Sequence, residues 1–67
     1  MTLAERIAWC EWLARQAGSL VDCDRYLAEA AGLRGEQMDD LAPPHCRMAY
    51  QLGVEDGRTL RRLEDAQ

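Results

Sequence analysis

The sequence predicts an all-α protein, a small bundle of three to four helices that forms one domain over residues 1–67. Three observations support this fold class. Apolar residues recur at helical spacing in several stretches, serine or threonine precedes two of these stretches, and glycines or prolines stand where they end. A chain of this size buries only about 60% of the surface that its unfolded form exposes, so it needs a disulfide, a metal or self-association to be more than marginally stable.

The first helix is expected over residues 3–17. Thr2 and Glu5 have the spacing of a capping box, in which each side chain accepts a hydrogen bond from the backbone of the other residue. Gly18 is the expected left-handed stop. Only Gly18 and Ser19 separate this helix from the next stretch with apolar residues at helical spacing. The first two helices are therefore expected to form an antiparallel hairpin.

The first helix is apolar around most of its circumference. Its core-facing stripe consists of Leu3, Ile7, Cys10, Ala14 and Ala17. Trp9 and Leu13 widen the stripe and Trp12 lies nearly opposite its centre, so the apolar arc spans roughly 220°, against about 100° for an ordinary surface helix. One neighbouring helix cannot cover so wide an arc.

The second helix is expected over residues 20–31. Ser19 and Asp22 form a second candidate capping box, and Gly32 followed by Leu33 has the pattern of a helix C-cap with its hydrophobic contact.

Residues 34–42 give the weakest pattern, and the spacing of Met38 and Leu41 predicts a short connecting helix there. Pro43 and Pro44 cannot continue that helix because proline lacks an amide donor. They can open the next one, whose first amides need no partner within the helix.

The last helix is expected over residues 44–66. Ala49, Gly53 and Gly57 leave a flat strip along it, and the cost of each mid-helix glycine, about 1 kcal/mol, would be offset if a second backbone or an indole packed there. The alternative is that Gly53 ends one helix and a turn follows; the continuous helix is favoured. Asp56 falls within the apolar arc and needs an arginine or a helix N-terminus beside it.

A homodimer is expected, with the interface on Leu13, Ala49, Gly53 and Gly57.

Composition limits the classes of function. The formal net charge is −4 and every basic residue is arginine, whereas a generic nucleic-acid-binding protein carries a basic excess. Charged residues interrupt every apolar run, so neither a secretory signal nor a membrane span is expected. The expected location is the cytoplasm, where cysteines stay reduced.

The sequence contains no pattern that predicts catalysis or metal binding. A zinc set could nominally be drawn from Cys10, Cys23, His45 and Cys46. Structural zinc sites usually contain closely spaced cysteine pairs, which this chain lacks, and all three cysteines fall on stripes expected to be buried. A cysteine nucleophile would need a nearby base and a concave pocket. We therefore expect no enzyme activity, no metal and no cofactor.

Two polar features suggest alternative functions. The second helix, the glycines at 32 and 35 and the short helix outline a helix-turn-helix, as in a small transcriptional regulator, but Glu36, Asp39 and Asp40 would repel phosphates. Asp39 and Asp40 could instead belong to an acidic face that competes for a nucleic-acid-binding surface. Helix capping and ordinary solubility explain these acidic residues more simply.

Trp9 and Trp12 are the residues most indicative of a partner, because tryptophan often dominates the energetics of protein interfaces. They would need no partner if the last helix of the same chain covered them. With few other large side chains available for a core, we expect a protein partner to contact Trp9 and Trp12, and also Asp39 and Asp40.

In its length, its acidic, lysine-free composition and its capping signal directly after Met1, the chain resembles the small stand-alone proteins of phages and mobile elements, including anti-CRISPR inhibitors. This resemblance implies a non-enzymatic module that binds a host protein or protein complex and inhibits it, by steric block or by acidic mimicry of a nucleic acid. A structural or assembly subunit is the main alternative.

Overall fold

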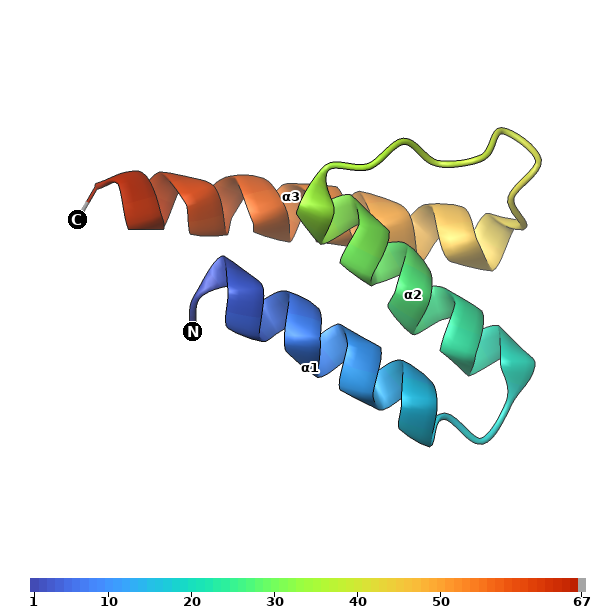
Figure 1. Cartoon of the computed structure of the whole chain (residues 1–67). Helices are drawn as coiled ribbons and strands as arrows, with labels where there is room; N and C mark the ends of the chain where they lie inside the picture. Colours follow the sequence, from blue (N-terminus) through green and yellow to red (C-terminus); the bar gives the residue numbers. More distant parts are fainter. Residues whose placement is uncertain (67) are drawn as a thin grey trace.

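The computed structural model describes residues 1–66, which form a small all-α bundle (Figure 1). The described part contains three helices and no strand: α1 spans Leu3–Gln16, α2 spans Leu20–Arg34 and α3 spans Pro44–Asp65. α1 and α2 form the antiparallel hairpin predicted from the short connection between them, and α3 is the longest helix. The predicted fold class is therefore confirmed.

The capping box expected at the start of α1 is present, and one of the two hydrogen bonds expected at the start of α2 is formed. The backbone N–H of Glu5 donates to Thr2 Oγ1 over 3.1 Å, and the backbone N–H of Thr2 donates to Glu5 Oε1 over 3.0 Å, which completes the capping box. These bonds from Thr2 lower the pKa of the Glu5 carboxyl, because they favour its charged form. At α2, Ser19 Oγ accepts from the N–H of Asp22 over 3.2 Å.

The predicted end of the second helix was wrong by one turn. α2 continues past Gly32 to Arg34, and Gly35, with φ of 78°, is the left-handed cap. The left-handed stop expected at Gly18 was also wrong, because α1 ends with Ala17 in an extended conformation and Gly18 has no positive φ. The Gly35 amide donates to the carbonyl oxygens of α2's last turn, as such a cap requires. Gly32 serves a different purpose, which is close packing against α3.

The short helix predicted over residues 34–42 is not formed. After Gly35 the chain runs as an irregular connection to Pro43, visible in Figure 1 as the long loop beside α3. The carboxylate of Asp39 accepts from the N–H of Leu41 over 2.9 Å, and Tyr50 Oη donates to the Glu36 carbonyl over 2.6 Å. These bonds engage backbone groups that a helix would have used, and such local bonding competes with helix formation.

α2 is the central element of the bundle. It packs along both other helices, whereas α1 and α3 meet at only a few points. The Cα trace measures 38 × 26 × 13 Å, so the three helices make a flat arrangement with much surface for its size. No helix within residues 1–66 is both long enough and apolar enough to cross a membrane.

The crossing of α2 and α3 occupies the glycine strip. A Cβ atom added at Gly53 would lie 2.1 Å from the carbonyl oxygen of Glu29, and one at Gly32 would lie 2.3 Å from the carbonyl oxygen of Tyr50. Gly57 is likewise buried against Leu33. α3 is therefore continuous through its glycines, as favoured above, because their lack of side chains lets the two backbones touch.

Three of the four residues expected at a dimer interface take part in this packing. Ala49, Gly53 and Gly57 are buried within one chain, beneath α2, and are not free to contact a second copy. The backbone of α2 in the same chain covers the glycine strip, so no second copy is needed to cover it.

The core is made of small residues. Its buried apolar members are Cys10, Ala14, Ala28, Ala30, Leu33, Cys46 and Ala49. Leu33 and Cys10 are the largest side chains that are fully buried. Many larger apolar side chains remain at the surface, so the helices meet through short side chains and leave the long ones outside.

Candidate interaction surface

Trp9 and Trp12 lie on the open side of α1. Their rings stack with centroids 5.2 Å apart and an interplanar angle of 13°. Trp9 is 48% exposed and Trp12 is 45% exposed, so about half of each residue is open to solvent. Leu13, also expected at an interface, is half-buried on the same helix. We call Trp9 and Trp12 the indole pair.

The stacked geometry follows from helical spacing. Residues three apart lie about 300° around a helix and so are neighbours on its surface, where long side chains can touch. A stacked aromatic pair is stabilised beyond the area that it buries. The indole pair is therefore an ordered, flat apolar surface on the isolated chain.

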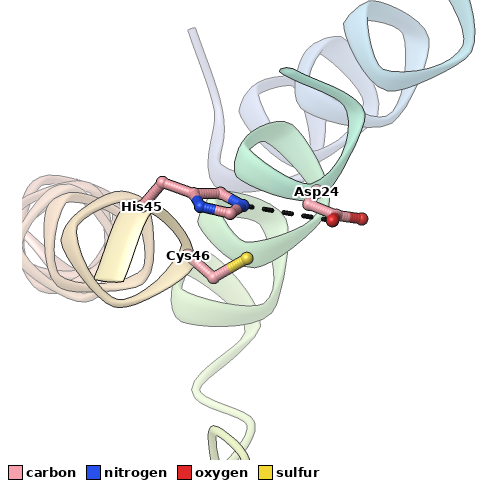
Figure 2. A group of neighbouring side chains, drawn as sticks. All are labelled: Asp24, His45 and Cys46. Carbon is pink, nitrogen blue, oxygen red and sulfur yellow. Dashed lines mark ion pairs between the residues drawn. The ribbon is translucent and has the colours of Figure 1, made fainter. Parts of the chain in front are cut away.

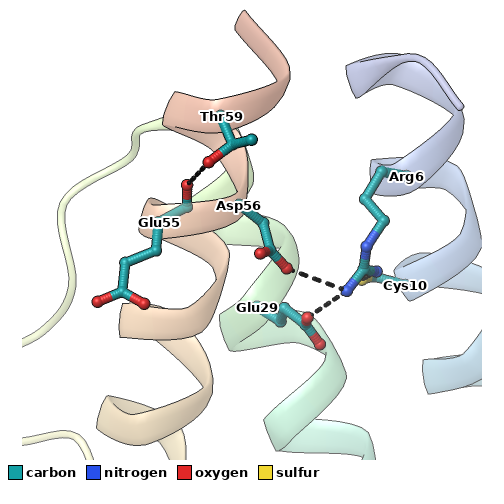
Figure 3. Close-up of polar contacts among 6 residues, drawn as sticks. All are labelled: Arg6, Cys10, Glu29, Glu55, Asp56 and Thr59. Carbon is teal, nitrogen blue, oxygen red and sulfur yellow. Dashed lines mark hydrogen bonds and ion pairs between the residues drawn. The ribbon is translucent and has the colours of Figure 1, made fainter. Parts of the chain in front are cut away.

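A polar network holds α1, and with it the indole pair, against the other two helices (Figure 3). Arg6 on α1 pairs with Glu29 on α2, and its Nη2 atom lies 3.6 Å from Asp56 Oδ2 on α3. Arg6 Nη1 also donates to Sγ of Cys10. Asp56 thus has the arginine partner that its place in the apolar arc required.

Replacing Arg6 with methionine is expected to lower the free energy of unfolding by about 1–3 kcal/mol, the range for a lost charge-assisted hydrogen bond. The reason is that Glu29, whose side chain is only 16% exposed, would lose its cation. Chemical denaturation followed by circular dichroism measures this change. Arg25→Met is the matched control, because the Arg25–Asp22 pair is exposed and its loss should cost less than about 0.5 kcal/mol. Equal stability of the two variants would contradict the assigned role.

The acidic residues do not form an uninterrupted acidic face. Asp22 pairs with Arg25 over 3.6 Å, and Glu36 lies 3.7 Å from Arg34. These arginines neutralise the carboxylates that adjoin them.

Asp39 and Asp40 lie in the connection that precedes α3. The Asp39 carboxylate caps its own turn, and Arg47 donates to the backbone carbonyl of Asp40. Both residues are exposed, but the Arg47 guanidinium lies beside them. The helix that would have carried them into a DNA groove is not formed, which removes the observation on which the helix-turn-helix alternative rested.

The structure separates the cysteines of the nominal zinc set. Cys10 packs with Ala30 and Leu33, whereas Cys46 packs in a second cluster with Ala28 and Ala49. Burial raises the pKa of the Cys10 and Cys46 thiols, so both are neutral at pH 7. All three cysteines are free thiols.

Sequence reasoning missed an apolar groove between α2 and α3. Its walls include Val21 and Tyr26 on α2 and Met48 and Leu52 on α3, around a volume of about 300 Å³. The helical spacing of Met48 and Leu52 was the available signal, since it places two large apolar residues on one side of α3. The groove is a second exposed apolar surface, distinct from the indole pair.

These features define a class: a small helical protein whose large apolar side chains lie mainly outside its core. No known protein-family model matches the chain, and no curated protein or solved structure is significantly similar to it.

Proposed function

We propose that this chain is a non-enzymatic protein-binding module whose contact surface is centred on the indole pair. The observation that carries the proposal is the stacking of Trp9 and Trp12 on the surface, each about half exposed. Large exposed apolar surfaces mark interaction sites, and buried tryptophans contribute strongly to binding. The stack is already ordered in the free chain, so binding costs little side-chain entropy.

Within this class, the narrower proposal is an inhibitor that binds a host protein or protein complex and blocks it sterically, as the resemblance to phage and mobile-element proteins implies. Steric block is favoured over acidic mimicry because arginines pair with Asp22 and Glu36, and Arg47 lies beside Asp40. A mimic of nucleic acid requires unpaired negative charge along its surface.

An assembly subunit is the second candidate, and the groove between α2 and α3 favours it. A chain with two separate apolar surfaces, the indole pair and this groove, can contact two neighbours at once. Such contacts between copies would repeat and give oligomers, whereas an inhibitor needs only one surface for its target.

The double substitution Trp9→Ala and Trp12→Ala is expected to abolish partner binding while the helices remain folded. Truncation of an interface tryptophan typically costs about 2 kcal/mol or more, which is roughly a 30-fold loss of affinity. The measurement is retention of partners from a lysate of the cells in which the chain is expressed naturally, together with sedimentation equilibrium of the purified chain for self-association. Circular dichroism establishes that the variant is folded.

Leu63→Ala is the matched control, because Leu63 is an exposed apolar residue on a different helix. This variant should retain the partners, or the self-association, of the unaltered chain. Recovery of the same partners and the same oligomers by the double tryptophan variant would refute the proposal. Loss of self-association alone would favour the assembly subunit over the inhibitor.

A further inference from the structure

Three side chains with metal-binding atoms meet where the second turn of α2 lies near the first turn of α3 (Figure 2). Asp24 comes from α2, and His45 and Cys46 come from the first turn of α3. Their ligand atoms all lie within 4.8 Å of one another. The two adjacent residues of α3 thus face the same carboxylate, although helical geometry alone separates their directions by about 100°.

His45 carries an unsatisfied polar atom at this place. Its Nε2 atom is buried and has no hydrogen-bond partner among the described residues. The nearest carboxylate oxygen, Asp24 Oδ2, lies 4.0 Å away, which is too far for a hydrogen bond. Buried polar atoms without partners are uncommon because each costs stability. The unpartnered Nε2 atom therefore indicates a bound ligand at this place.

The three donors match the ligand preferences of zinc. Cysteine sulfur, histidine nitrogen and aspartate oxygen all bind Zn²⁺, at about 2.0–2.3 Å, and a thiolate with an imidazole disfavours Mg²⁺ and Ca²⁺. A thiolate and a carboxylate would together balance the two positive charges of the ion. The side chains of Asp24 and His45 are partly exposed and can close around an ion by rotating.

We propose that Asp24, His45 and Cys46 bind one zinc ion, with water in the fourth position, and that the ion joins the start of α2 to the start of α3. The cysteines form no disulfide and most of the buried core side chains are small, so a metal would supply a cross-link that the chain otherwise lacks. Binding displaces the proton of the Cys46 thiol, because zinc coordinates the thiolate. The unpartnered Nε2 atom of His45 then acquires its partner.

The test is a zinc titration of the full chain, purified under reducing conditions and stripped with a chelator, in competition with a chromophoric chelator. One zinc ion per chain is expected. Cys46→Ser and His45→Gln should each lower the affinity by more than roughly 100-fold, since loss of even an outer-shell partner costs 10–100-fold. Cys23→Ser is the matched control, because Cys23 is a free thiol outside the cluster and its loss should leave the affinity unchanged.

Thermal unfolding supplies a second readout. The midpoint should rise with zinc concentration in the unaltered chain and in Cys23→Ser, but not in His45→Gln, whose partly exposed position lets the apo chain fold. Cobalt(II) should give a thiolate charge-transfer band that Cys46→Ser abolishes. The proposal is overturned if the unaltered chain binds no zinc, if His45→Gln binds as tightly as the unaltered chain, or if Cys23→Ser loses zinc equally.

Discussion

Replacing Gly53 with alanine is expected to lower the free energy of unfolding by a large fraction of its total. The added Cβ would lie 2.1 Å from the carbonyl oxygen of Glu29 and 3.0 Å from its carbonyl carbon, both of which are backbone atoms of α2. A backbone cannot rotate aside as a side chain does, so α2 and α3 must separate. Their contact is the most extensive in the molecule, and its loss would expose the residues buried along it.

The expected cost is about 3 kcal/mol or more, at the upper end for overpacked positions. A chain of this length has a total stability of roughly 3–10 kcal/mol, so this loss removes about a third of it or more. Urea denaturation followed by circular dichroism measures it. The direction of the change in stability is informative, because replacing glycine with alanine in an exposed helix stabilises the protein by about 1 kcal/mol.

Gly18→Ala is the matched control for this experiment. A Cβ atom at Gly18 would meet no atom within 4 Å, so this variant should unfold at nearly the same urea concentration as the unaltered chain. A Gly53→Ala variant more stable than the unaltered chain would show that α2 does not lie against Gly53.

Replacing Leu33 with alanine should lower the free energy of unfolding by about 2–5 kcal/mol, the range for large-to-small changes in a core. Leu33 is the largest fully buried side chain. It packs with Cys10 and Ala30, and Leu3 and Leu60 of the other two helices close the same cluster. No other fully buried side chain among the described residues is as large as Leu33.

Denaturant titration measures this loss, with Leu41→Ala as the control. Leu41 is 89% exposed in the connection before α3, so its truncation should change stability by less than about 0.5 kcal/mol. If the two leucine variants were equally stable, Leu33 would not be the centre of the core.

The helix starts could be predicted because they depend on local chemistry. The bonds of Thr2 with Glu5, and of Ser19 with Asp22, involve residues three apart, so their spacing in the sequence predicts them. The end of α2 could not be predicted, because the sequence does not show which of two nearby glycines caps the helix and which allows close packing. Gly35 is needed for its positive φ, whereas Gly32 is needed for close approach to Tyr50.

The same limit applies to the glycine strip of α3. Its sequence predicted that a second backbone or an indole packs there, but not from which copy of the chain. The contact partner, Glu29, belongs to the same chain and lies far from Gly53 in sequence, so only the folded structure identifies it. For this reason the sequence assigned Ala49, Gly53 and Gly57 to a dimer interface, whereas α2 of the same chain covers them.

Of the candidate sites, the sequence predicted the exposed indoles but not the cluster of metal-binding side chains. The wide apolar arc of the first helix indicated that its indoles exceed what the chain itself can cover, and they are half exposed. The cluster of Asp24, His45 and Cys46 was not predicted, because the nominal zinc set contained only the cysteines and His45. Asp24 joins them through the packing of α2 against α3, which spacing along the chain does not encode.

The central claim is that Trp9 and Trp12 are open to solvent in the isolated chain and are covered by another protein in the functional complex. The chain has two tryptophans, so 5-fluorotryptophan labelling reports on these indoles alone. The most direct measurement is the difference in ¹⁹F chemical shift between H₂O and D₂O, made on the dilute chain and on the complex. We predict a clear solvent shift for both resonances in the dilute chain, which falls in the complex. A shift already absent from the dilute chain, or unchanged in the complex, would contradict the claim.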